Sequence, residues 1–190
     1  MKIIKQKDIK TTNWSGGTTT ELFIYPPESN YRNLDFKFRL SRATIEVKTS
    51  DFTPLINVKR TLMLLDGELE LIHKNHHCKY LKPYQFDTFM GDWQTKCIIK
   101  SDPPQATDFN LMMLDDTQGT LSVIKAKKSQ YHHYSIINDF TVFYVAEGEM
   151  KLENSNLSKG ELLIIENPQP NKFEFKVTAN SNIIVVRIDV

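Results

Sequence analysis

Short apolar runs alternate with polar turn-forming segments along the whole chain. β-Branched and aromatic residues crowd these runs, as at 120–124, 138–145 and 183–188, and such residues are typical of strands. Gly, Pro and Asp-Gly pairs between the runs are typical of turns. No stretch of the sequence has sustained helical periodicity with a cap at each end. The pattern therefore predicts an all-β protein built as a sandwich or barrel.

One strand–turn–strand pattern occurs twice. Residues 65–71 (LDGELEL) correspond to residues 146–152 (AEGEMKL), and in each copy an apolar run precedes the turn and another follows it. This repetition predicts the duplication of one β unit, with a β-hairpin turning at Gly67 in the first copy. The copies differ at one informative position, because Arg60 in the first aligns with the neutral Thr141 in the second.

Composition excludes several classes of function. The chain has 190 residues, and its 24 basic and 23 acidic residues nearly cancel, which argues against a general nucleic-acid or anionic-membrane surface. The start of the chain is too polar for a signal peptide. No apolar run approaches the roughly 18 residues of a membrane span. Cys78 and Cys97 lack CxxC spacing, so we expect two reduced cysteines in a cytoplasmic protein, with a disulfide as the alternative.

Two arginines are predicted to face the core. Arg39 and Ser41 share a strand face with the apolar residues of 43–47, and Arg60 shares one with the leucines of 62–64. An unpaired buried charge costs several kcal/mol, so a partner must accept the hydrogen bonds of these guanidinium groups.

Three interpretations of the arginines remain open. In the first, an internal ion network pairs them with Glu21, Asp92 or Asp108. In the second, they lie at the mouth of a β-barrel pocket and bind a carboxylate or a similar planar anion. In the third, the predicted facing is wrong and both are exposed. The first two can coexist, because an acid often holds a pocket arginine in place.

The segment 13–21 (NWSGGTTTE) is a second candidate. Adjacent glycines let backbone amides approach a ligand closely, Trp14 could wall a pocket, and Glu21 places an acid on the following strand. The alternative is a glycine turn that leads into an edge strand. The segment lacks the GxGxxG and GxxxxGK[ST] motifs of nucleotide-binding loops.

Five motifs, taken in order, resemble the HutD/Ves family. They are residues 13–21 (NWSGGTTTE), 38–43 (FRLSRA), 60–62 (RTL) leading to Gly67, 91–92 (GD) and 108–112 (DFNLM). The resemblance covers roughly residues 10–115, and the second half matches only as the weaker repeat. It implies a bicupin, an all-β chain of two cupin-like β-barrels or jelly rolls. Residues 1–115 would form the barrel with the pocket, and residues 116–190 a compact, degenerate barrel interlocked with it.

The resemblance also implies biology. HutD proteins are associated with histidine utilisation and with a formylglutamate-like ligand, and Ves proteins with cold and stress response. Metal-binding cupins present His-x-His, a Glu and a further His, and the segment after Arg60 offers no such pair. The histidines come later: His73, His76, His77, His132 and His133. We expect them to be exposed or half-buried, and we expect no metal or other cofactor.

We therefore expect a metal-independent bicupin that binds a small anionic metabolite, formylglutamate-like or another carboxylate, rather than turning it over. Arg39 and Arg60 would bind the anion, Ser41 and Asn110 orient it, Trp14 wall it, and Glu21 and Asp92 hold the arginines. One alternative is a metal-independent isomerase or hydrolase with Glu21 or Asp92 as general base. Another is a non-catalytic interaction protein with internally paired arginines. We expect no nucleic-acid or membrane partner, and exposed edge strands leave a homodimer open.

Overall fold

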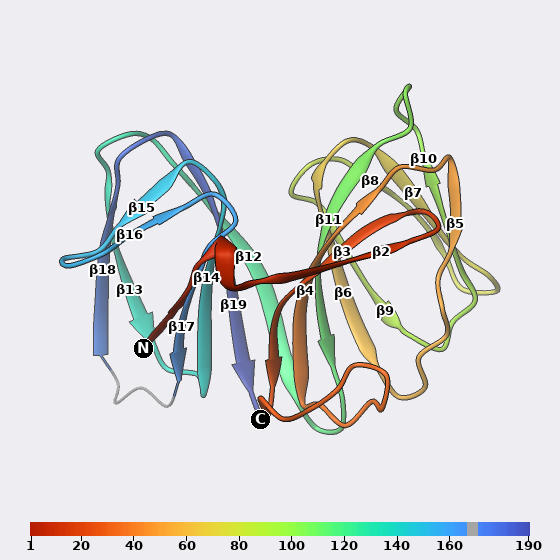
Figure 1. The fold of residues 1–190 in the computed structure, drawn as a ribbon, viewed down its shortest axis with the longest axis horizontal. Helices are drawn as coiled ribbons and strands as arrows, with labels where there is room; N and C mark the ends of the chain where they lie inside the picture. Colours follow the sequence, from red (N-terminus) through yellow and green to blue (C-terminus); the bar gives the residue numbers. More distant parts are fainter. Residues whose placement is uncertain (167–170) are drawn as a thin grey trace. The chain divides into compact units, whose positions relative to one another are not determined.

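Nearly all the regular secondary structure of the described residues is antiparallel strand. The computed structural model describes residues 1–166 and 171–190, in which strands alternate with turns and a short 3-10 helix, η1 (Gln6–Asp8), follows the first strand (Figure 1). The chain forms two compact units. We call Lys10–Thr117 the first unit, and Gln118–Val190 together with Met1–Ile9 the second unit. The all-β prediction is confirmed.

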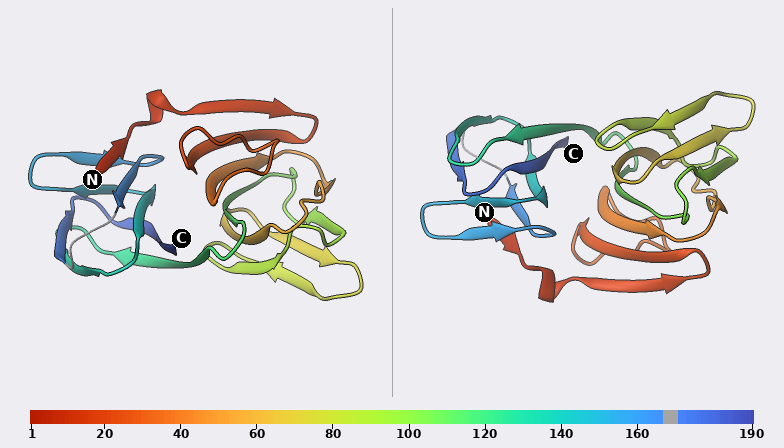
Figure 2. Two further views of the ribbon diagram at one scale, coloured as in Figure 1. Left: turned by 90° about the horizontal axis from the view of Figure 1, so that it is seen from below. Right: turned by 90° about the horizontal axis from the view of Figure 1, so that it is seen from above.

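The first unit consists of two antiparallel sheets, with strand orders β2-β3-β4-β11-β6-β9 and β5-β10-β7-β8. Its strands are β2 (Lys10–Trp14), β3 (Gly17–Tyr25), β4 (Phe38–Ile45), β5 (Thr49–Asp51), β6 (Lys59–Asp66), β7 (Leu69–His73), β8 (Cys78–Leu81), β9 (Phe86–Met90), β10 (Thr95–Ile99) and β11 (Ala106–Met113). Figure 2 shows β2 and β3 as paired red strands, with β2 at the edge of the larger sheet. Apolar side chains from both sheets, such as Leu64 of β6 and Leu71 of β7, form one buried core.

The second unit repeats this arrangement, with strand orders β12-β19-β14-β17-β1 and β13-β18-β15-β16. Its strands are β1 (Lys2–Ile4), β12 (Gln118–Ala126), β13 (Tyr131–Ile136), β14 (Phe140–Glu147), β15 (Glu149–Lys151), β16 (Asn156–Ser158), β17 (Leu162–Glu166), β18 (Asn171–Val177) and β19 (Ser181–Asp189). Each strand from β4 to β11 has a counterpart eight labels later, and counterparts have corresponding neighbours within these two sets. The duplication inferred from the sequence is therefore present in the strand pairing.

The glycine turn of each copy is a crossing between sheets. β6 and β7, which flank Gly67, belong to different sheets of the first unit, and β14 and β15 flank Gly148 in the same way. Gly67 has φ +87°, and a Cβ there would lie 2.5 Å from the carbonyl oxygen of Gln105. The predicted hairpin at Gly67 is wrong, because β6 pairs with β9 and β11 while β7 pairs with β8 and β10.

The boundaries of the units differ from the predicted 1–115 and 116–190. β1 pairs with β17, so residues 1–9 belong with the second unit, and the first unit extends to Thr117. Within the described residues none of the four sheets closes into a barrel, so each unit has the open, two-sheet form of the predicted barrel or jelly roll.

Both cysteines of the chain, Cys78 and Cys97, are free thiols. Cys97 is fully buried in the core of the first unit, and burial raises the pKa of its thiol to about 12. Across residues 1–166 and 171–190, no helix combines the length and the apolar character that a membrane crossing requires.

Candidate functional site

A cavity of about 710 Å³ lies in the first unit, within the range of roughly 300–1,000 Å³ that is usual for small-molecule sites. Residues from β2, β3, β4, β5, β6 and β11 line it, together with the segment after β5. Among the residues predicted for a ligand site, those that line the cavity are Trp14, Arg39, Ser41, Arg60 and Asn110. The structure therefore brings together residues from four separate strands.

Strand β4 presents one of its faces to the cavity. Arg39 and Ser41 line the cavity together with residues 43, 45 and 47, which is the alternation expected of an extended strand. Phe38 and Leu40, on the opposite face, have no exposed surface. Because β4 is covered on both faces at this end, the charge of Arg39 is enclosed by protein, as the alternating pattern predicts.

The two arginines lie two strands apart in the same sheet. Met112 of β11 is opposite Arg39 on one side and opposite Arg60 on the other, so their backbones are about 10 Å apart at the usual strand spacing. Arg39 is 5% exposed and Arg60 is 7% exposed. Asn110 lies two positions earlier on β11, opposite Ser41, and so faces the cavity between the arginines.

Arg39 is held firmly by its neighbours. Its Nε donates a hydrogen bond to Glu21 Oε2 at 2.7 Å, and its Nη1 donates to Ser41 Oγ at 3.1 Å. The ring of Tyr31 lies 4.3 Å from the guanidinium carbon, within the range of a cation–π contact. Glu21 does not line the cavity, and from β3 it holds Arg39 as the sequence predicted.

Arg60 is held much more loosely. Its Nη2 donates to Asn110 Oδ1 at 3.1 Å, whereas its buried Nε has no hydrogen-bond partner among the described residues. The rings of Phe52 and Phe89 lie 4.6 Å and 5.3 Å from the guanidinium carbon. Leaving a buried donor unsatisfied costs about 1–3 kcal/mol. The site therefore offers a positive group that lacks part of its hydrogen bonding.

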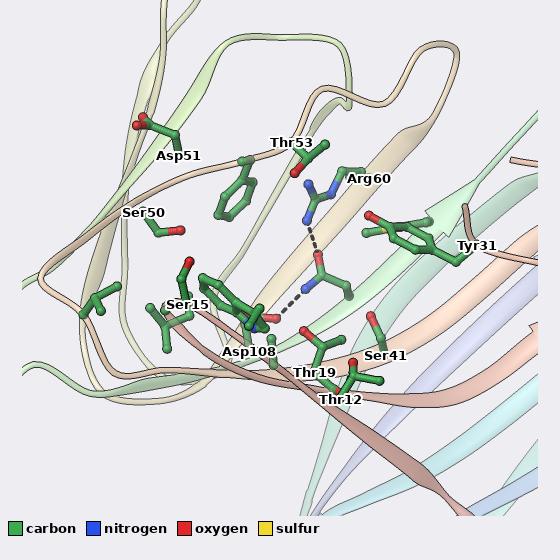
Figure 3. A pocket seen from close by; sticks show the side chains of 18 of the residues that line it. Thr12, Ser15, Thr19, Tyr31, Ser41, Ser50, Asp51, Thr53, Arg60 and Asp108 are labelled. Atoms are coloured by element: carbon green, nitrogen blue, oxygen red, sulfur yellow. Dashed lines mark hydrogen bonds between the residues drawn. The ribbon is translucent and has the colours of Figure 1, made fainter. Parts of the chain in front are cut away.

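Asp108 completes the chain of contacts that begins at Arg60. Asn110 Nδ2 donates to Asp108 Oδ1, so the dashed lines in Figure 3 run from Arg60 through the amide to Asp108. Asp108 is 2% exposed. Burial raises the pKa of its carboxyl to about 7, although the charge of Arg60 and hydrogen bonds from Ala43 and Asn110 oppose the rise. This group changes its charge near neutral pH inside the cavity.

The sequence named Asp108 only as a partner in an ion network and did not place it in the ligand site. The available signal was its spacing, because Asp108 and Asn110 are two positions apart on one strand face. Asp92, by contrast, was predicted to hold an arginine, and this role is corrected. It is exposed in the turn after β9 and does not line the cavity, because β9 ends at Met90 before Asp92 is reached.

Trp14 forms part of the cavity wall and is 39% exposed. Its indole lies over Gly16, where a Cβ would come within 2.1 Å of the ring. A glycine at position 16 therefore leaves room for the indole. The hydroxyl residues Ser15 and Ser50 also line the cavity, on the far side from Arg60 (Figure 3).

The expectation of exposed or half-buried histidines is wrong for His73. This residue ends β7, is 2% exposed and lies outside the cavity lining. Burial lowers the pKa of its imidazole, and its hydrogen bond with Asp87 opposes that shift. The sequence could not indicate this burial, because residues 73–77 looked like a polar hairpin tip.

Comparison with known proteins identifies the fold. The chain is similar to the conserved protein of unknown function PA5104 from Pseudomonas aeruginosa PAO1, with a TM-score of 0.81 and 18% identity over 100% of this chain and 98% of that one. It is similar to HutD from Pseudomonas fluorescens SBW25, with a TM-score of 0.80 and 18% identity over 99% and 97% of the two chains. No curated protein sequence matches it significantly.

A more distant likeness extends to the bacterial pirin YhhW from Escherichia coli, with a TM-score of 0.75 and 11% identity over 98% of this chain and 97% of that one. These likenesses confirm a cupin-like all-β fold. The sequence model of the family described as HutD matches residues 6–185. The motifs around Arg39, Arg60 and Asn110 fall within that match. The chain belongs to the HutD family.

Proposed function

We propose that this protein binds a small carboxylate metabolite in the cavity of its first unit. One observation carries the proposal: the buried guanidinium of Arg60 lines the cavity, and its Nε has no hydrogen-bond partner in the part of the chain that the structure describes. A carboxylate oxygen is a strong acceptor for such a donor, since charge-assisted hydrogen bonds are roughly twice as strong as neutral ones. The ligand would therefore supply the hydrogen-bond acceptor that the Arg60 Nε lacks.

The second arginine favours a ligand with two acceptor groups. Burial lowers the pKa of the Arg60 guanidinium, and the positive charge of Arg39 adds to this effect. A dianion between the two side chains would relieve their repulsion. Ser41 lies beside Arg39 on β4, Asn110 lies on β11 between the two arginines, and both would orient the ligand through hydrogen bonds.

The family narrows the ligand class. Because the chain is a HutD protein, we propose an N-formylglutamate-like dicarboxylate as ligand and a regulatory role in histidine utilisation. A cavity of about 710 Å³ has ample room for a glutamate derivative. The role we propose is binding by a cytoplasmic protein without turnover.

The two alternatives have less support. An enzyme with Glu21 or Asp92 as general base would need these groups in the cavity, but neither lines it. A protein whose arginines serve only internal ion pairs would satisfy both of them. Arg39 meets this description through Glu21, whereas Arg60 does not.

Isothermal titration calorimetry with N-formyl-L-glutamate, L-glutamate and glutarate tests the proposal, with the neutral diamide glutaramide as the charge control. Arg60→Ala should weaken binding about tenfold or more, which corresponds to losing one charge-assisted hydrogen bond of about 1.5–3 kcal/mol. Arg60→Lys should also weaken it, because an ammonium cannot reproduce the planar fork of donors.

Arg42→Ala is the matched control, because Arg42 follows Ser41 on β4, in the same sheet as Arg60, but does not line the cavity. This variant should bind as the wild type does. Failure of every carboxylate to bind, or equal affinity in Arg60→Ala and the wild type, would contradict the proposal.

A further inference from the structure

Three side chains of the types that bind metal ions converge in the first unit, outside the cavity. They come from separate segments of the chain. His73 ends β7, His77 precedes β8, and Asp87 lies on β9. β7 belongs to the smaller sheet and β9 to the larger one, so the cluster joins the two sheets. None of the three residues lines the cavity described above.

The distances in this cluster suit a common ligand. His73 Nε2 lies 3.1 Å from Asp87 Oδ2, His77 Nε2 lies 2.8 Å from the same oxygen, and all three atoms are within 4.8 Å of one another. Two ligands on a tetrahedral Zn²⁺ ion with bonds of about 2.0–2.1 Å are separated by about 3.3 Å. Small side-chain adjustments would therefore place a metal ion at bonding distance from all three atoms.

The hydrogen bonds behind His73 orient it as a metal ligand. Thr95 Oγ1 donates to the carbonyl oxygen of Trp93 at 3.2 Å and lies 2.8 Å from His73 Nδ1. The ring can adopt either tautomer. In the one with the proton on Nδ1, which the Thr95 hydroxyl accepts when its own proton goes to Trp93, the lone pair on Nε2 faces the Asp87 carboxylate. Two acceptors that face each other are best satisfied by a cation between them.

Aromatic packing holds the cluster in place. The centroid of the His73 ring lies 4.4 Å from the ring centroid of Phe89 and 5.6 Å from that of Trp93. His76 stacks on Trp93 at 3.7 Å, which anchors the turn that carries His77. The His77 side chain is 39% exposed, so an ion can reach the site from solvent. A fourth position would remain for water, as in zinc sites with three protein ligands.

We propose that His73, His77 and Asp87 form a binding site for a divalent first-row transition metal ion, with Zn²⁺ as the reference ion, and that the ion ties the two sheets of the first unit together. Two imidazole nitrogens and one carboxylate oxygen are a donor set that such ions prefer. The expectation that the protein holds no metal came from the missing His-x-His pair near Arg60 and from histidines expected to be exposed or half-buried, and it did not bring Asp87 together with His73 and His77. The proposal is independent of ligand binding at Arg60.

The test uses full-length protein freed of metal with a chelator and then titrated with Zn²⁺ by calorimetry. Wild-type protein should bind one equivalent, and Co²⁺ in its place should give the visible absorption bands of a four-coordinate ion. Zn²⁺ should also raise the thermal unfolding midpoint, because a ligand that binds only the folded state stabilises it. His77→Ala and Asp87→Asn should weaken binding at least about tenfold, the lower end of the loss seen when even an outer partner of a metal site is removed.

Two controls define the site. His133→Ala removes an exposed histidine of the second unit that lies 3.0 Å from Glu174, and it should bind Zn²⁺ as the wild type does. Arg60→Ala should also keep its Zn²⁺ affinity, which separates this result from the test of anion binding. Absence of one-to-one Zn²⁺ binding in the wild type, or unchanged affinity in both His77→Ala and Asp87→Asn, would overturn the proposal.

Discussion

The two arginines of the cavity differ in what surrounds each guanidinium group. Arg39 has a carboxylate and a hydroxyl as acceptors, whereas Arg60 has one neutral amide, and residues 1–166 and 171–190 offer no acceptor to its Nε. Their burial is nearly equal, so the difference in pairing alone makes Arg60 the available donor. Asp108, which reaches Arg60 through Asn110, then decides how much positive charge the cavity presents.

Because of Asp108, we expect anion binding to weaken as the pH rises. Burial raises the pKa of its carboxyl to about 7. Below this pH the group is neutral and does not offset the positive charge of Arg60, which is then free to attract the ligand. Above it, the Asp108 carboxylate competes with the ligand for Arg60. A single linked proton changes the dissociation constant by up to about tenfold per pH unit. Calorimetry with glutarate from about pH 6 to about pH 8.5 measures this, since its carboxyls stay ionised there.

Asp108→Asn provides the control for this pH dependence. The variant keeps the shape of the side chain but stays neutral, so its affinity should not fall across that pH range. The same raised pKa affects folding: the folded state holds the proton more tightly than the unfolded state between about pH 4 and about pH 7. The stability contribution of Asp108 therefore falls as pH rises through that window. An equally steep fall in affinity in Asp108→Asn would exclude this residue as its source.

Residue-level prediction from the sequence succeeded where strand alternation alone decides the direction of a side chain. Arg39, Ser41 and Arg60 were placed correctly because each lies within a regular strand beside apolar residues that mark the core face. Asp92 was misplaced, because it belongs to a turn, where no periodicity fixes direction. The burial of His73 was missed because its partners Thr95 and Asp87 come from distant parts of the sequence.

At the scale of elements, the sequence identified the turn residues but did not show that each turn connects two different sheets. The sequence located the turns at Gly67 and Gly148, yet local signals cannot tell which sheet the following strand joins. That choice depends on long-range pairing, here of β7 with β10 and of β15 with β18. A corner between two sheets and a hairpin within one sheet look alike in the sequence, since both need a glycine with positive φ.

The corner glycines are predicted to be essential for stability. Gly67→Ala forces a side chain into φ +87° and against the carbonyl oxygen of Gln105, and Gly148→Ala meets the carbonyl oxygen of Asn180 at 2.4 Å with φ +81°. The backbone penalty alone is about 1–2 kcal/mol, so each variant should lose at least this much free energy of unfolding. Urea denaturation measures the loss.

Gly119→Ala is the control for the corner glycines, because Gly119 lies within β12 and has no positive φ. It should change stability much less than either corner variant. A loss as large in Gly119→Ala as in Gly67→Ala would show that chain flexibility, rather than the corner geometry, sets the cost.

At the scale of the whole molecule, duplication has left the two units with different chemistry. Thr141 occupies the position on β14 that Arg60 occupies on β6, and its buried hydroxyl has no partner among the described residues. The sequence revealed both the duplication and the family, because these depend on ordered motifs. It could not reveal that the first nine residues join the second unit, since β1 pairs with a strand far away in the sequence.

This pairing predicts that the start of the chain stabilises only the second unit. β1 forms the edge of the sheet beside β17, with Ile3 packed against the core of that unit. Deletion of residues 2–9 should therefore speed amide exchange in β17 and its neighbour β14, because an interior strand becomes an edge. Strands β4, β11 and β6 should keep their protection, and carboxylate affinity should not change. Hydrogen exchange read by mass spectrometry separates the two units, and faster exchange concentrated in β4 and β6 would contradict the assignment of β1.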